Sequence, residues 1–92
     1  MTEDESVVIG IRAVAFMASE DDLLEVFCKS SGLSPKELRA CLEDPNFLAS
    51  VLAFLLQDDG WTQGFCISEA VRPADVAAAH ALLSGGPVPN WT

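Results

Sequence analysis

The chain repeats itself. Residues 14–40 align with residues 52–78 without a gap. The identities include Ala15-Phe16 with Ala53-Phe54, Phe27-Cys28 with Phe65-Cys66, Pro35 with Pro73, and Ala40 with Ala78. Helical hairpins resemble one another in general, but the gapless match and the shared Phe-Cys and proline positions favour a true repeat. The sequence therefore predicts two three-helix units, about 7–42 and 45–83, packed together around a pseudo-twofold axis.

Helix start and stop signals divide each unit into three helices. Acidic or serine side chains precede the expected starts, prolines occupy first helical positions, and Gly32 and Gly85 follow expected ends. The expected helices are 7–18, 23–30, one from Pro35, 45–57, 61–70 and 73–83. No segment alternates between apolar and polar residues, so no strand is expected. The chain is predicted to be all-α: a single compact bundle of five to six short helices spanning 1–92, with a flexible acidic N-terminus at 1–6 and an extended C-terminal tail at 86–92.

The charge of the chain excludes several classes of partner. Fourteen acidic residues stand against five basic ones, which gives a net charge of −9. Nucleic-acid binding depends on Lys and Arg contacts to phosphates, so neither nucleic acid nor an anionic membrane surface is an expected partner. The segment that starts at Met1 is acidic, so a secretory signal is not expected there, and no apolar run is long enough to span a bilayer. A cytoplasmic location is expected.

Side chains that carry chemistry are few and scattered. One lone imidazole, His80, is expected at the edge of the core rather than in a site. The acidic clusters at 20–22 and 58–59 lack the spacing of a calcium loop and coincide with helix starts, which favours capping. The three cysteines lack CxxC spacing and a neighbouring base, so they are expected to be inert, reduced thiols: Cys28, Cys41 and Cys66. The sequence predicts no catalytic residue, no cofactor and no metal site, and therefore no enzyme.

An excess of apolar residues points to an interaction. Half of the residues are hydrophobic, more than a chain of 92 residues easily hides. The first helix is apolar on nearly every side, so Val7, Val8 and Ile11 are expected at an interface. Trp91 is a further candidate, because tryptophan is common at binding hot spots; alternatively it docks on its own domain or lies on a free end. We expect a protein-interaction or self-association module, most simply a symmetric homodimer, or alternatively a binder of a small apolar ligand between the two units.

A family resemblance covers nearly the whole chain outside its two ends. The residues that carry it are Ala15-Phe16, the segment 27–35 that ends in Gly-Leu-Ser-Pro, Leu38-Arg39, the segment 44–48 (Asp-Pro-Asn-Phe-Leu) and Val51-Leu52. In these residues the chain resembles a family of short bacterial proteins known only as a domain of unknown function. The resemblance implies an all-helical fold, and it supplies no activity, ligand or catalytic residue.

Overall fold

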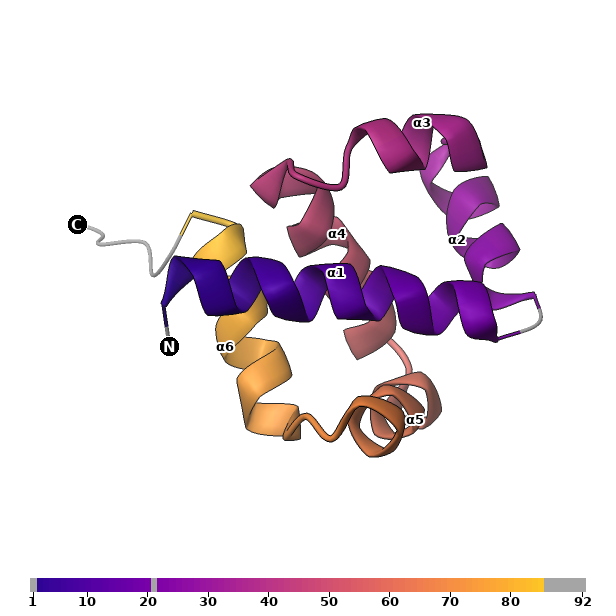
Figure 1. Cartoon of the computed structure of the whole chain (residues 1–92). Helices are drawn as coiled ribbons and strands as arrows, with labels where there is room; N and C mark the ends of the chain where they lie inside the picture. The colour runs from indigo at the N-terminus through magenta and orange to yellow at the C-terminus, as the bar shows by residue number, and fades with distance from the viewer. Residues whose placement is uncertain (1, 21, 86–92) are drawn as a thin grey trace.

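The protein folds into six α-helices, and no strand occurs among residues 2–20 and 22–85, the part of the chain that the computed structural model describes. The helices are α1 (Glu3–Ser19), α2 (Leu23–Ser31), α3 (Pro35–Ala40), α4 (Pro45–Leu56), α5 (Asp59–Glu69) and α6 (Pro73–Leu83) (Figure 1). The expected all-α class and the series of six helices are confirmed. The tail at 86–92 lies outside the described residues.

Prolines stand at the start of three helices where the sequence predicts them. Pro35, Pro45 and Pro73 stand in the first turns of α3, α4 and α6. Before α3, the Ser34 hydroxyl accepts a hydrogen bond from the Glu37 amide at 3.2 Å, and the Glu37 carboxylate accepts one from the Ser34 amide at 3.1 Å. This reciprocal capping box satisfies amides that a first helical turn leaves without partners.

The first helix begins earlier than the sequence predicts, at Glu3 rather than at Val7. The Thr2 hydroxyl accepts a hydrogen bond from the Glu5 amide at 3.1 Å, and the Glu5 carboxylate accepts one from the Thr2 amide at 2.9 Å. These hydrogen bonds hold the pKa of the Glu5 carboxyl below its usual value. Acidic side chains also favour the positive end of the helix dipole. Residues 3–6, expected to be a flexible N-terminus, therefore form the first turn of α1.

The start of α5 and the capping of α2 also differ from the prediction. α5 begins at Asp59 rather than at Trp61, because the Asp58 carboxylate ahead of it accepts a hydrogen bond from the Trp61 amide at 3.1 Å. At α2, Asp22 stands before the helix, but its side chain makes no hydrogen bond to a first-turn amide. Capping by an acidic side chain is therefore confirmed at Asp58 and is wrong at Asp22.

Two helices end in the same way at repeat-equivalent positions, meaning positions that the alignment of the two halves matches. Gly32 closes α2 with a φ of 80°, and its amide donates to the Cys28 carbonyl at 2.9 Å. Ala70 closes α5 with a φ of 54°, and its amide donates to the Cys66 carbonyl. The left-handed conformation costs conformational free energy for a residue with a Cβ. Ala70 bears this cost in the second unit, whereas Gly32 avoids it in the first.

The core lies where α1, α4 and α6 pack against one another, with α5 covering one end (Figure 1). α4 buries side chains on nearly all sides, as its sequence predicts. The largest side chains that lose all contact with solvent come from α1, α4, α5 and α6: Met17, Leu48, Val51, Leu52, Leu55, Phe65 and Val76.

Phenylalanine pairs link the two halves reciprocally. The Phe16 and Phe65 rings meet edge-to-face with centroids 5.6 Å apart, and the Phe27 and Phe54 rings do so at 5.2 Å. Phe54 is the repeat equivalent of Phe16, and Phe65 is that of Phe27. All four side chains are buried. Each pair therefore joins one ring from the first half to one ring from the second half, and the repeat alignment converts one pair into the other.

Helices α1 and α4 cross closely at Gly10. A Cβ atom added at Gly10 would lie 2.9 Å from the Leu48 Cβ, closer than real Cβ atoms approach one another. Leu48 occupies the position equivalent to Gly10 when the repeat alignment is extended toward the N-terminus, and it is fully buried. The absence of a side chain at residue 10 is what lets the two helices approach.

The third helices of the two units differ. α6 has eleven residues and packs along both α1 and α4, whereas α3 has six and makes no comparable contact with either. Leu38 is the buried residue of α3, at 4% exposure. The first unit is therefore less closed than the second, and the space beside α3 is where the candidate site lies.

Candidate functional site

A row of exposed, mostly apolar side chains runs along α1. Five positions spaced four, three, four and three residues apart face solvent: Asp4, Val8, Ile11, Ala15 and Ala18. Val8 is 50% exposed and Ile11 is 39% exposed. A row of exposed apolar side chains is more informative about contacts than a single exposed one. We call this row the α1 stripe.

The structure places the sequence-predicted interface residues on different sides of α1. Val8 and Ile11 belong to the α1 stripe, whereas Val7 is half-buried and packs against the core cluster. Residue 7 lies about 100° around the helix from residue 8, which turns its side chain toward the core. Trp91 lies outside the described residues.

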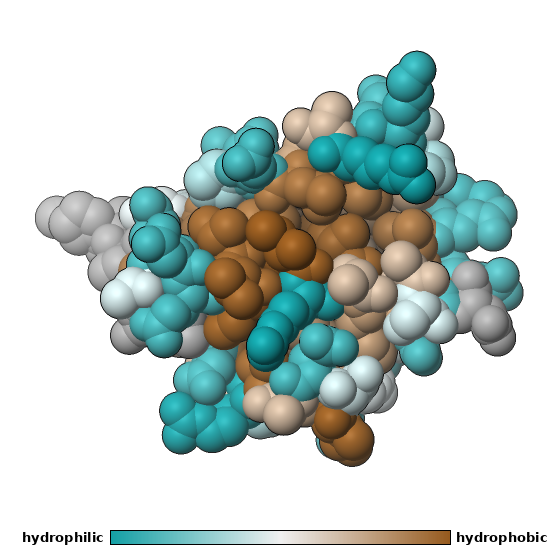
Figure 2. Space-filling model, viewed as in Figure 1, coloured by the Kyte–Doolittle hydropathy of each residue, from teal (hydrophilic) through white to brown (hydrophobic). Residues whose placement is uncertain are grey.

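An apolar groove runs beside the α1 stripe. Its volume is about 300 Å³, and Arg39 is the charged residue among those that line it. Figure 2 shows the broad apolar area on this face of the molecule, interrupted by hydrophilic side chains. We call it the α1–α3 groove; it is lined by Ile11, Val14, Ala15, Ala18, Leu24, Pro35, Leu38, Arg39 and Leu42.

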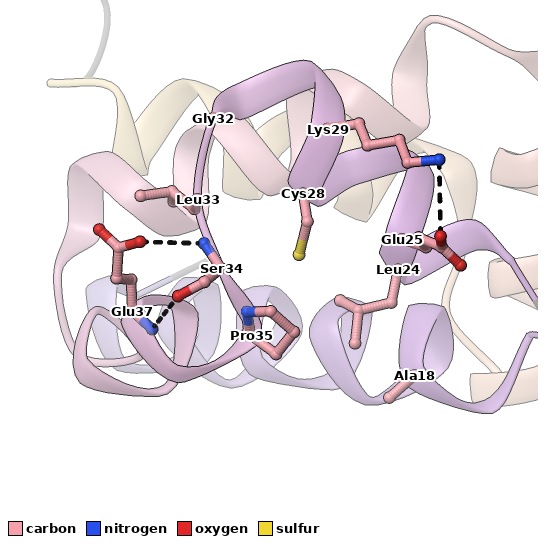
Figure 3. A pocket seen from close by; sticks show the side chains of 10 residues that line it. All are labelled: Ala18, Leu24, Glu25, Cys28, Lys29, Gly32, Leu33, Ser34, Pro35 and Glu37. Atoms are coloured by element: carbon pink, nitrogen blue, oxygen red, sulfur yellow. Dashed lines mark hydrogen bonds and ion pairs between the residues drawn. The ribbon is translucent and has the colours of Figure 1, made fainter.

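A larger cavity of about 680 Å³ adjoins the groove and shares Ala18, Leu24 and Pro35 with it. It lies between α2 and α3, and in Figure 3 the Cys28 sulfur points into it between Leu24 and Pro35. The polar groups on its wall already have partners: the Lys29 ammonium lies 3.5 Å from the Glu25 carboxylate, and the Ser34–Glu37 capping box closes the far side. The cavity thus offers apolar surface rather than unsatisfied polar groups.

The Cys28 and Cys66 thiols do not have the environment of nucleophiles. Burial raises the pKa of the Cys28 thiol, and the neighbouring Glu25 charge raises it further. Burial also raises the pKa of the Cys66 thiol. Because the thiolate is the reactive form, both groups are less reactive at neutral pH than an exposed cysteine. His80 is half-buried on α6, and among residues 2–20 and 22–85 no three His, Cys, Asp or Glu side chains gather as metal ligands would.

The arginine side chains differ in whether they have a hydrogen-bond or ion-pair partner. Arg72 forms a bidentate pair with Asp75 at 3.1 and 3.2 Å, and Arg12 donates to the Glu69 carbonyl at 3.5 Å. Arg39, on the wall of the α1–α3 groove, is exposed and forms no ion pair with any described residue. The groove therefore presents a positive charge on a strongly acidic protein.

Sequence reasoning missed most of the groove. The alternating spacing of the α1 stripe was visible in the sequence, since intervals of three and four residues place side chains on one helix face. Leu24, Leu38 and Leu42 carried no such signal, because their place beside α1 depends on how α2 and α3 pack in the fold.

Other exposed apolar residues stand away from the groove. Ile67 on α5 is 82% exposed, and Val26 on α2 is 42% exposed. Trp61, a candidate hot-spot residue by type, is half-buried and stacks on Phe54 with centroids 4.8 Å apart. Isolated exposed residues of this kind are common on monomers, so they make a weaker interface than the α1 stripe.

Comparison with known proteins gives a family and no individual relative. None of the described helices is long and apolar enough to cross a membrane. No curated protein matches the chain. No solved structure matches it either. A family model does match over residues 3–86, nearly the whole chain, and the protein therefore belongs to the family described as "Protein of unknown function (DUF3572)".

Proposed function

We propose that the protein is a helical self-association module and that two copies dock through the α1 stripe and the adjoining α1–α3 groove. The observation that carries this proposal is the exposure of Val8 and Ile11 along one side of α1, together with the apolar groove that Ile11 also lines. Surfaces of this kind on small domains mark sites of protein contact. We also propose a cytoplasmic location. The same surface would suit a different protein partner, which is the coarser form of this proposal.

The free energy of association requires that the dimer bury the α1–α3 groove as well as the α1 stripe. Full burial of a valine or isoleucine side chain contributes about 1.5–3 kcal/mol, so the half-exposed Val8 and Ile11 of two copies contribute roughly 4 kcal/mol. That only matches the lower end of the cost of association, about 4–15 kcal/mol. A stable interface of about 800 Å² per partner must therefore extend over the apolar groove wall, including Leu24 and Leu42.

The internal repeat supports the groove as a helix-docking slot. We propose that the two units are related by a pseudo-twofold axis that passes near the Gly10–Leu48 contact; a residue beside such an axis contacts its own equivalent. The reciprocal phenylalanine pairs fit the same relation. In the second unit α6 packs along α1 and α4. The short α3 leaves the corresponding apolar surface of the first unit open for another helix.

Substitution of Ile11 by aspartate tests the docking surface. Because Ile11 lies in the centre of the α1 stripe, an aspartate there would be buried without a partner on association, and the dissociation constant should rise by at least about a hundredfold. The matched control is Ile67→Asp, the same change at a more exposed isoleucine on α5. Sedimentation equilibrium gives both constants. Equal effects of the two substitutions, or none, would contradict the proposed surface.

A second candidate is the binding of a small apolar ligand. The sequence placed such a site between the two units, whereas the 680 Å³ cavity lies within the first unit, between α2 and α3. Its size falls within the range of ligand pockets, about 300–1,000 Å³. Native mass spectrometry separates the two candidates, because association doubles the mass of the chain and a ligand adds only its own.

A further inference from the structure

We infer that the second copy docks antiparallel, with its α1 along the α1 stripe and its acidic first turn against Arg39 in the α1–α3 groove. This inference rests on the proposed self-association and specifies its geometry. Three observations carry it: the spacing of the α1 stripe, the order of large and small residues along it, and the opposite charges of the first turn of α1 and of Arg39 in the groove.

The spacing of the stripe suits packing between helices. Intervals of four and three residues reproduce the a and d positions of a helix pair, where side chains of one helix insert between those of another. The stripe runs straight along the exposed side of α1 from Asp4 to Ala18. A second α1 can therefore contact it along its whole length.

The residue sizes along the stripe favour the antiparallel direction. With Ile11 against the partner's Ile11, Val8 lies against the partner's Ala15, so that a large side chain meets a small one on each side of the twofold axis. A parallel pair would place valine on valine and alanine on alanine, which crowds one end and leaves a gap at the other. Close packing disfavours both.

The charges favour the same direction. The first turn of α1 carries three acidic residues at positions 3–5. A parallel pair would bring six of these charges together, which is costly for chains that each carry −9. An antiparallel pair instead carries the partner's Asp4 to Ala18, which lines the α1–α3 groove together with Arg39. Arg39 has no ion-pair partner among the described residues of its own chain, so it is available.

Charge reversal at the two positions tests this register. Arg39→Glu and Asp4→Arg should each raise the dissociation constant about tenfold, because the twofold axis repeats every pair and reversal turns attraction into repulsion. The double variant, Asp4→Arg with Arg39→Glu, should recover most of the loss. Two controls make the same charge changes outside the groove: Arg72→Glu just before α6 and Asp59→Arg in the first turn of α5.

The results separate the register from the proposed function. Recovery in the double variant, with little change in the controls, supports the antiparallel register. If Ile11→Asp abolishes association while the groove variants behave like the controls, the surface stands and this register is wrong. If the unmodified chain is monomeric throughout, the proposed function fails and the register fails with it.

Discussion

Replacement of Phe65 by alanine is expected to destabilise the fold by about 3–5 kcal/mol. The Phe65 side chain is 0% exposed and packs edge-to-face against Phe16, so alanine leaves a cavity and removes an aromatic contact. Domains of this size are stable by only about 5–15 kcal/mol, so this loss is a large part of the free energy of unfolding and should lower the urea midpoint strongly. Urea denaturation followed by circular dichroism measures the loss.

The matched control for this variant lies two residues further along α5, at the highly exposed Ile67. Because surface substitutions have small effects, Ile67→Ala should change the free energy of unfolding by no more than about 0.5 kcal/mol. If Phe65→Ala were as mild as Ile67→Ala, the placement of α5 against α1 would be wrong. Phe27, the repeat equivalent of Phe65, should lose a similar amount of stability on truncation because its ring packs against Phe54 in the same manner.

Enlarging Gly10 is expected to destabilise the protein progressively. A methyl group at residue 10 would lie 2.9 Å from the Leu48 Cβ, an atom fixed to the backbone, so α1 and α4 must separate. Such crowding costs about 1–3 kcal/mol, and the higher helix propensity of alanine returns at most about 1 kcal/mol. Gly10→Val adds further atoms at the same point and should lose more than Gly10→Ala.

The control for this series is Gly64→Ala on α5. There the added methyl meets only the edge of the Phe16 ring, at 3.3 Å, and the ring can shift by a small amount. This variant should therefore retain more stability than Gly10→Ala in the same thermal or urea titration. A series in which Gly10→Ala and Gly10→Val both stabilise the protein would show that the helices do not cross closely at Gly10.

The fold was predictable where its causes are local. Pro35, Pro45 and Pro73 start helices and Gly32 ends one because each acts on the backbone within one turn. The membership in a family of unknown function was also correctly recognised from the sequence. The early start of α1 was missed even though its Thr2–Glu5 capping box is a local signal of the same kind.

The candidate site was less predictable because it depends on packing between distant segments. The exposure of Val8 and the half-burial of Val7 are decided by which side of α1 faces α4 and α6. The groove depends in addition on α3 being six residues long and standing apart from α1, whereas its repeat equivalent α6 packs closely. Repeat similarity alone would have placed both third helices in equivalent positions.

Static light scattering of the unmodified chain at micromolar concentration tests the central claim most directly. Each protomer carries a net charge of −9, so two protomers repel each other. This repulsion extends about 8 Å at about 0.15 M salt and only about 3 Å at about 1 M salt. If apolar burial through the α1 stripe and the α1–α3 groove drives docking, the mass should be twice that of the chain and the dimer should tighten as salt rises. A single-chain mass at both salt concentrations would contradict self-association.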